Sequence, residues 1–380
     1  MSQHPHILVD ATAIPSNRGG VGRYLEYLLP ALDAVGARMT VVVKSPDAEW
    51  VRLGAPHAEV VVSEAAGRSR ARRLAWEQWG LPRLARRHRA DVVFSPHYTM
   101  PVLSPVPVVV TLHDATFFSH PELHGRLKRA FFRLWTRYSL RRAAATIVPS
   151  AATRDEEVAH AHARPESVTV AYHGVDTARF HPPTAEQVAD ARRLLGGASE
   201  WIAFLGTLEP RKNVANLVRA FDLLAAHRPG LALALAGGRG WDTELDGVIA
   251  AASARARIHS LGFVDDGVLP GLLGGAVAVA YPSLGEGFGL PVLEAMACGA
   301  PVVTTRLLAL PEVGGEAALY SEPDAGSLAA ALATLVDDPA ERARRSALGV
   351  TQAARFSWAD SARTHLAVFT AAAVRPRRAA

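Results

Sequence analysis

Two glutamates frame a glycine-rich segment in the second half of the sequence. Glu286 opens the run Glu-Gly-Phe-Gly-Leu-Pro, and Glu294 follows with seven residues between the two acids. Pro291 suits the first turn of a helix and Gly299 suits its left-handed end, so the loop stops where a helix begins. Free amides at a helix start bind phosphate or sugar oxygens, and carboxylates accept hydrogen bonds from vicinal hydroxyls. Either glutamate alone is typical of a surface acid, but together they predict a site for one extended, hydroxylated anion. The predicted site comprises Glu286, Gly287, Phe288, Gly289, Leu290 and Glu294.

Two adjacent cations, Arg211 and Lys212, follow an apolar run at residues 201–205 and open a helical pattern at 214–226. Two positive charges oppose the dipole at a helix N-terminus, so a bound anion explains them better than helix capping does. An arginine offers planar bidentate donors to a diphosphate, and a lysine offers a point charge. A solvated surface pair is the alternative. We predict a phosphate-binding loop, in which both cations stabilise a departing diphosphate.

Two further candidates lie in the first half of the chain. Gly19 and Gly20 precede an amphipathic helical pattern, where bare backbone lets a ligand approach and the amides favour an anion. A structural turn is the alternative, and Lys44 stands where a dinucleotide-binding sequence would carry its ribose-binding acid. His113 follows the apolar run 106–112, a position from which it can donate a hydrogen bond to a sugar or a leaving group. A half-buried histidine with a packing role is the alternative.

Short β-branched runs alternate with helical patterns from end to end, which predicts βαβ units and parallel sheets covered on both faces. A break at Phe180-His181-Pro182-Pro183 divides the runs into two series, since prolines lack amide donors and favour extended backbone before them. We therefore predict α/β domains over residues 1–182 and 183–356, and a helix over 357–374 with a basic tail to 380. The expected strands cover residues 7–9, 40–43, 60–62, 91–94, 108–110, 146–148 and 168–170, then 201–205, 233–235, 257–259, 277–280 and 301–303.

The positive charge is concentrated in the first half. Residues 1–182 carry 23 Lys and Arg against 16 Asp and Glu, a net charge of +7. Residues 68–89 hold eight arginines and one acid, residues 126–142 hold seven basic residues and no acid, and both stretches interleave aromatic side chains. Such a surface suits the phosphates of nucleic acid or an anionic membrane. The alternative is a packing role. One helical face predicts that most of these aromatic side chains pack into the core, and it comprises Leu127, Ala130, Phe131, Leu134 and Tyr138.

Cysteine usage and the termini indicate the compartment. The single cysteine, Cys298, can form no internal disulfide, which is typical of a reducing compartment. The first residues show no secretory signal, and no apolar run approaches the length of a membrane span. No Asp-x-Asp motif is present, and Pro121 spoils a helical pairing of His120 with His124, so we expect no metal and no cofactor. The expected location is the cytoplasm.

Taken together, the motifs resemble those of glycosyltransferase family 4, retaining enzymes with the GT-B fold, in which two Rossmann-like domains flank an interdomain cleft. The resemblance covers essentially the whole chain, and its last two motifs are highly specific together. The matching pieces are Gly19-Gly20, His113-Asp114, Val148-Pro149-Ser150, His173-Gly174-Val175-Asp176, residues 206–213, and the element from Glu286 to Glu294.

The resemblance implies that residues 1–182 bind the acceptor and residues 183–356 bind the nucleotide-sugar, and it implies a role for each candidate residue. Arg211 and Lys212 would bind the donor diphosphate, Glu286 the donor sugar and Glu294 the ribose. The amides of Phe288, Gly289 and Leu290 would bind sugar and phosphates. His113 would lie beside the transferred sugar, and Gly19 and Gly20 would border the phosphates. The final helix would cross back to the first domain.

The sequence therefore predicts a retaining, metal-independent glycosyltransferase. The expected donor is GDP-mannose, followed by UDP- and dTDP-sugars, and the acceptor is a glycan, a lipid-linked sugar or a small molecule. Residues 68–89 and 126–142 would give peripheral contact with the inner face of an anionic membrane. The alternatives are a nucleic-acid-binding protein that uses the basic first half, and an NAD-dependent oxidoreductase suggested by the paired Rossmann pattern.

Overall fold

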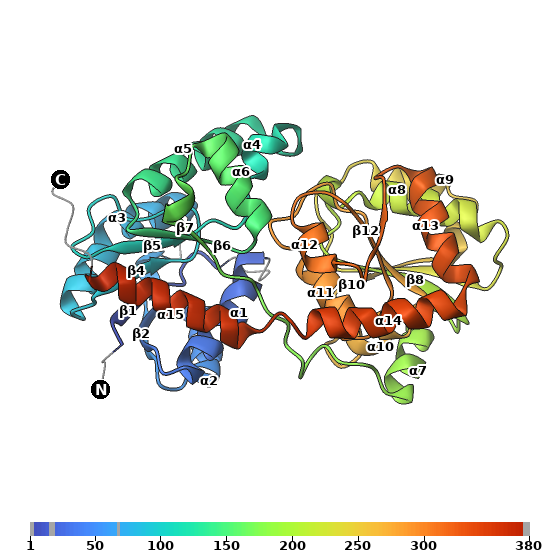
Figure 1. Cartoon of the computed structure of the whole chain (residues 1–380), viewed down its shortest axis with the longest axis horizontal. Helices are drawn as coiled ribbons and strands as arrows, with labels where there is room; N and C mark the ends of the chain where they lie inside the picture. The colour runs from blue at the N-terminus through green and yellow to red at the C-terminus, as the bar shows by residue number, and fades with distance from the viewer. Residues whose placement is uncertain (1–3, 15–19, 67–68, 375–380) are drawn as a thin grey trace. The chain divides into compact units, whose positions relative to one another are not determined.

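The structure is a computed structural model that describes residues 4–14, 20–66 and 69–374 (Figure 1). The chain forms two compact units. The first is Met1–Gly174 together with Ser357–Ala380, and the second is Val175–Phe356. Each unit has its own sheet and its own hydrophobic core.

The first unit is built on a parallel sheet, with seven strands in the described part of the chain, in the order β3-β2-β1-β4-β5-β6-β7. Its central strands β1, β4 and β5 are buried along their whole length, as expected of runs covered on both faces. Each valine or leucine buried there contributes roughly 1.5–3 kcal/mol to folding. The strands are β1 (His6–Asp10), β2 (Arg38–Val43), β3 (Glu59–Val62), β4 (Val92–Ser95), β5 (Val108–Thr111), β6 (Ala145–Val148) and β7 (Val168–Val170).

Helices pack on this sheet, and the last of them comes from the far end of the sequence. In Figure 1 this helix, α15, lies beside α1 and the first strands, and its Phe369 ring packs 4.9 Å from that of Phe94 on β4. The Ser357 hydroxyl accepts hydrogen bonds from the amides of Ala359 and Asp360 and so caps α15. The helices of this unit are α1 (Gly20–Ala34), α2 (Ala48–Gly54), α3 (Arg70–Arg87), α4 (Thr116–Ser119), α5 (Arg126–Arg142), α6 (Ala151–Ala161) and α15 (Trp358–Val374).

The second unit repeats this architecture. Its parallel sheet, six-stranded among the described residues, has the order β10-β9-β8-β11-β12-β13. The strands are β8 (Glu200–Leu205), β9 (Leu231–Ala236), β10 (Ile258–Gly262), β11 (Ala278–Tyr281), β12 (Val302–Thr305) and β13 (Leu319–Ser321). The helices are α7 (Ala185–Leu194), α8 (Val214–Ala225), α9 (Leu245–Ala251), α10 (Leu269–Gly274), α11 (Leu290–Ala297), α12 (Leu310–Gly314), α13 (Ala325–Asp337) and α14 (Pro339–Ala353). The prediction of two α/β sheets in tandem is confirmed.

Two details differ from the sequence-based expectation. The edge strand β13 was not predicted, because its three residues are only half-buried and form no apolar run. The second unit begins at Val175 rather than after Pro182, because Phe180 is 1% exposed and belongs to the core of the second unit.

The faces of α5 also differ from the prediction. Leu127 and Leu134 were expected in the core, but their exposed fractions are 86% and 68%. The aromatic side chains of α5 do pack inward, as predicted: Phe132, Trp135 and Tyr138 contact the first unit's core. Because α5 has apolar side chains on both faces, its periodicity identified the buried face only in part.

Candidate active site

The candidate site of the second unit lies where the strand order of its sheet reverses. The chain leaves β8 toward β9 on one side, and β11 pairs with β8 on the other. In open parallel sheets, this reversal creates a crevice outside the carboxyl ends of the strands, where ligands bind. The loops after β8 and β11 meet at this point, because the Leu284 amide donates to the Arg211 carbonyl at 2.8 Å.

The loop after β8 rests on the loop after β9, backbone against backbone. A Cβ atom on Gly237 would lie 2.1 Å from the Gly206 carbonyl oxygen, so only glycine fits there. The Leu208 amide donates to the Gly238 carbonyl at 3.0 Å. This close packing fixes the path of the segment that ends in Arg211 and Lys212.

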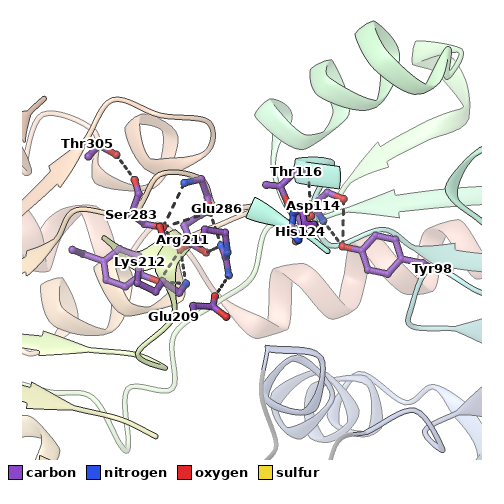
Figure 2. Close-up of polar contacts among 12 residues, drawn as sticks. Tyr98, Asp114, Thr116, His124, Glu209, Arg211, Lys212, Ser283, Glu286 and Thr305 are labelled. Carbon is purple, nitrogen blue, oxygen red and sulfur yellow. Dashed lines mark hydrogen bonds and ion pairs between the residues drawn. The ribbon is translucent and has the colours of Figure 1, made fainter. Parts of the chain in front are cut away.

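Those two cations converge on one carboxylate, as Figure 2 shows. Glu286 Oε2 accepts from Arg211 Nη1 at 2.8 Å, and Oε1 accepts from Lys212 Nζ at 2.5 Å. Oε1 also accepts from the Ser283 and Tyr281 hydroxyls, at 2.6 and 2.9 Å. The sequence placed Arg211, Lys212 and Glu286 in one site, and the structure brings their side chains into contact.

Charge pairing determines the ionisation of this cluster. Burial alone would raise the pKa of Glu286, but Arg211 and Lys212 lower it to about 2, so the group is a carboxylate at neutral pH. Burial and the neighbouring Arg211 lower the pKa of Lys212, and Glu286 opposes them. Burial and the charge of Glu286 keep the pKa of Tyr281 well above 10, so its hydroxyl stays a donor. The cluster holds its cations in place before any ligand binds.

The glycine-rich segment continues from Glu286 into α11. Gly289 precedes the helix with a φ of +104°, a left-handed conformation that favours glycine, and Leu290 is the first helical residue. Phe288 is buried, its ring 5.7 Å from that of Phe356, so its side chain anchors the loop. Glu294 lies inside α11 and is 1% exposed. The predicted binding roles of Gly287, Phe288, Gly289, Leu290 and Glu294 stay predictions.

His113 lies in the first unit, two residues after the end of β5. Its Nε2 atom donates to the Pro96 carbonyl at 2.7 Å, and the edge of its ring meets Tyr24, with the ring centroids 5.0 Å apart. Burial lowers the pKa of His113, so the ring is neutral at pH 7. With the proton on Nε2, the other nitrogen, Nδ1, is a hydrogen-bond acceptor.

A polar network holds the loop that follows His113 (Figure 2). The Asp114 amide donates to the Tyr98 hydroxyl at 3.0 Å, and Asp114 Oδ1 accepts from the Thr116 hydroxyl at 2.8 Å. His124 Nε2 donates in turn to that hydroxyl at 2.8 Å. His124, which the sequence considered only for a metal, therefore helps to anchor the loop. Gly20 is the first residue of α1, and Gly19 lies outside the described residues.

Sequence reasoning missed several members of the cluster around Glu286. Tyr281 is the last residue of β11, and Ser283 follows it in the loop. Glu209, whose Oε1 accepts from Arg211 Nη2 at 2.8 Å, lies within the matching segment 206–213 but was assigned no role. Nothing in residue type marks a strand-end tyrosine or serine as functional, so only their three-dimensional proximity reveals them.

Within the described ranges, one group of ligating side chains is compact enough to share a metal ion. Asp10, Glu77 and His97 of the first unit each place one ligand atom within 4.8 Å of the others. The sequence did not predict this group, because its members come from β1, α3 and the loop after β4. The Arg73 guanidinium already lies among them, with Nη1 2.9 Å from Glu77 Oε2 and 3.0 Å from His97 Nε2.

The two basic stretches, residues 68–89 and 126–142, consist largely of the helices α3 and α5, which lie at the surface of the first unit. On α3, Trp79 is 64% exposed, and on α5 the exposed arginines include Arg137 and Arg141. Among the described residues, no helix has the length and apolar character needed to cross a bilayer.

Comparison with known proteins identifies the family. Residues 18–179 match the model described as Glycosyltransferase Family 4, and residues 189–349 match Glycosyl transferases group 1. The O-antigen chain mannosyltransferase B of Escherichia coli is 32% identical over 253 residues, which cover 66% of each protein. The chain thus spans just under two thirds of the length of that relative. Glycogen synthase of Mycobacterium tuberculosis is 30% identical over 391 residues, which cover 93% of this chain and 91% of that protein.

The solved structures agree on the fold. HepE from Anabaena, in complex with UDP-glucose, has a TM-score of 0.78 at 23% identity, covering 96% of this chain and 98% of that chain. Family and fold favour the enzyme over the nucleic-acid-binding and oxidoreductase alternatives. The chain belongs to glycosyltransferase family 4 and has the GT-B fold.

Proposed function

We propose that this enzyme transfers mannose from GDP-mannose to a hydroxyl of a glycan or lipid-linked acceptor, with retention of configuration and without a metal ion. The observation that carries the proposal is the contact of Arg211 and Lys212 with Glu286 at the carboxyl edge of the second sheet. The similarity to an O-antigen chain mannosyltransferase supports mannose and a glycan acceptor. The complex of HepE with UDP-glucose supports UDP-sugars as the second choice of donor.

In this proposal, Arg211 and Lys212 bind the donor diphosphate and stabilise the charge that develops as it leaves. Glu286 Oε1 accepts from three side chains, whereas Oε2 accepts from Arg211. Since each carboxylate oxygen offers about two lone pairs, Oε2 has the greater capacity for a hydroxyl of the donor sugar. Glu294 and the amides at the start of α11 bind the ribose and the phosphates.

His113 takes a role that differs from the initial expectation. Its Nε2 proton is already donated to Pro96, so Nδ1 is the nitrogen that meets a ligand. We therefore assign His113 to accept a hydrogen bond from a hydroxyl of the transferred sugar, rather than to donate one. Gly19 and Gly20 would border the phosphates at the start of α1.

A thermal-shift panel of GDP, UDP, dTDP, ADP and NAD tests the donor site. A ligand at a hundred times its Kd stabilises the folded protein by roughly 2.7 kcal/mol. We expect a selective shift with GDP that is lost in Lys212→Ala and in Glu294→Ala. Arg219→Ala is the matched control, since Arg219 is a surface cation on α8 that pairs with Glu244. A shift from NAD alone, or from none of the five, would contradict the proposal.

The stereochemistry and the metal independence have their own measurements. NMR of the product should show the anomeric configuration of the donor sugar. Activity should persist in EDTA, because Arg211 and Lys212 supply the charge that a metal would otherwise supply. An inverted product, or activity that EDTA abolishes and Mg²⁺ restores, would refute the corresponding part of the proposal.

We also propose that the first unit contacts an anionic membrane from the cytoplasmic side through residues 68–89 and 126–142. Leu127 and Leu134 on α5 are exposed beside arginines, a combination that suits an interface of lipid headgroups and acyl chains. The test is flotation with vesicles containing anionic lipid, at low and at high salt. We expect binding at low salt that weakens in the double variant Leu127→Ser, Leu134→Ser. The control is Leu223→Ser, whose leucine on α8 is 57% exposed. No flotation at either salt would refute the contact.

A further inference from the structure

The first sheet reverses its strand order between β1 and β4, just as the second does between β8 and β11. Asp10 is the last residue of β1, and His97 follows the end of β4 by two residues. Arg73 and Glu77 reach the same point from successive turns of α3. The crevice at which an open parallel sheet binds ligands therefore carries a group of charged side chains in each unit.

Arg73 lies at the centre of the group in the first unit. Its Nη1 atom is 2.9 Å from Glu77 Oε2, 3.0 Å from His97 Nε2 and 3.7 Å from Asp10 Oδ2. The Thr99 hydroxyl donates to Glu77 Oε2 at 2.7 Å and accepts from Arg73 Nη2 at 3.3 Å. Since Arg73 donates to His97 Nε2, the ring proton of His97 is on Nδ1. Three of the five guanidinium N–H groups thus donate within the group, to Glu77, His97 and Thr99.

Asp10 differs from these residues, because only one of its two carboxylate oxygens accepts a hydrogen bond. Oδ1 accepts from the Thr12 amide and hydroxyl, at 3.0 and 2.6 Å, which fixes the orientation of the carboxylate. Oδ2 points into the group, 3.7 Å from both Arg73 Nη1 and His97 Nε2, and has no hydrogen-bond partner among the described residues. Asp10 is 0% exposed. A buried acceptor without a hydrogen bond costs about 1–3 kcal/mol, so Asp10 Oδ2 gains free energy from any donor that reaches it.

The charges around Asp10 Oδ2 restrict what it can bind. A metal ion does not fit while the Arg73 cation occupies the position between Glu77 and His97. An anion would be repelled by the negative charge of the Asp10 carboxylate. A neutral hydroxyl fits both neighbours, since it donates to Asp10 Oδ2 and accepts from the Arg73 guanidinium. Arg73 and His97 are the least buried members, with side chains 15% and 8% exposed, so the approach is past them.

We infer that Asp10 and Arg73 form a binding site for a hydroxyl of a neutral sugar, the acceptor of the transfer reaction. The inference rests on the proposed function. The family resemblance already implies that the first domain binds the acceptor, and the inference names the residues there that would do so. Asp10 and Arg73 touch the acceptor in this site, and Glu77 and Thr99 position the guanidinium.

Binding of methyl α-glycosides to the full chain, without donor, tests the inference. The probes are the methyl α-glycosides of mannose, glucose, galactose and rhamnose, followed by saturation-transfer NMR. At least one should bind the unmodified protein and should bind Asp10→Asn about tenfold or more weakly, because a hydrogen bond to a charged group is lost. Arg73→Lys should weaken the same glycoside, since a lysine does not reproduce the planar guanidinium. Arg73 is the more exposed residue, so this variant keeps the test valid if Asp10→Asn does not fold.

Asp33→Asn is the matched control. Asp33 is also buried in the first unit and accepts from His57 Nδ1 at 2.9 Å, but it belongs to neither site. This variant should bind the glycoside as the unmodified protein does. Equal binding by Asp10→Asn and Arg73→Lys, or no binding of any probe to the unmodified protein, would overturn the inference.

Thermal shifts with GDP, recorded on the same samples, separate this inference from the proposed function. One outcome is that GDP raises the Tm of all variants while Asp10→Asn and Arg73→Lys bind the glycoside as tightly as the unmodified protein. This outcome would overturn the acceptor site but would not contradict the donor site. No shift of the unmodified protein with any nucleoside diphosphate would contradict the proposed function itself.

Discussion

Replacing Glu286 with glutamine should remove a pH-dependent part of the stability of the second unit. The folded environment lowers the pKa of Glu286 from 4.5 to about 2. Each unit of pKa difference corresponds to about 1.4 kcal/mol, so the ionised carboxylate contributes about 3 kcal/mol to folding. The side chain is 10% exposed, so solvent screens this contribution little. Glu286→Gln should therefore lower the free energy of unfolding by about 3 kcal/mol at pH 7.

The pH dependence follows from the sign of the shift. Because the folded pKa is lower than the unfolded pKa, the contribution is fully present above pH 4.5 and is lost as the pH falls toward 2. The difference in stability between the unmodified protein and Glu286→Gln should be largest at pH 7 and should shrink progressively below pH 4.5. Titrating groups remote from Glu286 affect both proteins alike and cancel in this difference, whereas the pKa of Lys212, which Glu286 raises, falls further in the variant.

Urea denaturation at pH 7, 4 and 3 measures the effect on the second unit, where Trp201 is buried on β8. The control is Glu244→Gln, because Glu244 pairs with Arg219 at the surface and its side chain is 61% exposed. An exposed pair of this kind contributes about 0–1 kcal/mol, so the control should change little. A cost for Glu286→Gln that matches the control, or that does not vary with pH, would refute the charge pairing described here.

Three further predictions concern other parts of the chain. Burial, with the charge of Asp114 adding, raises the pKa of Glu157 well above 4.5, so the folded state keeps a proton that the unfolded state releases. Stability should fall by up to about 1.4 kcal/mol per pH unit above pH 4.5, and Glu157→Gln should flatten this slope in denaturation at pH 5 and 8. Gly237→Ala, whose Cβ would meet the Gly206 carbonyl at 2.1 Å, should lower both Tm and GDP affinity, whereas Gly247→Ala on α9, with open space around it, should not lower either. Tyr24 donates to His365 Nε2 at 2.6 Å, so Tyr24→Phe should cost about 1–3 kcal/mol in urea denaturation, because a buried nitrogen loses its donor. An unchanged pH slope, Tm or urea midpoint would contradict the respective prediction.

The sequence predicted most of the fold because its strands are buried on both faces. Runs such as Val108-Val109-Val110 are both β-branched and uninterrupted, so composition alone identifies them. β13 has no such run, and it becomes a strand only by pairing with β12. On α5, apolar residues lie on all sides of the helix. The buried face is therefore determined by tertiary packing, in which Phe132 and Trp135 contact the core of the first unit.

The cluster around Glu286 was predictable in part, because Arg211, Lys212 and Glu286 each stand in a motif next to a helix start. The ion pairs among them could not be predicted, because residues 212 and 286 are far apart in the sequence and no sequence pattern indicates that they are in contact. The group around Asp10 was missed for the same reason. Its members are single polar residues on three elements, and only the parallel order of β1 and β4 brings them together.

Release of nucleoside diphosphate from nucleotide-sugars tests the central claim most directly. Purified protein is incubated with GDP-mannose, UDP-glucose or a dTDP-sugar, with and without a mannose-terminated oligosaccharide, and compared with Arg211→Ala. We expect release from GDP-mannose that the oligosaccharide accelerates and that falls about a hundredfold or more in Arg211→Ala, because a cation aimed at the departing diphosphate is removed. No release from any of the three donors, or equal release by Arg211→Ala, would contradict the account.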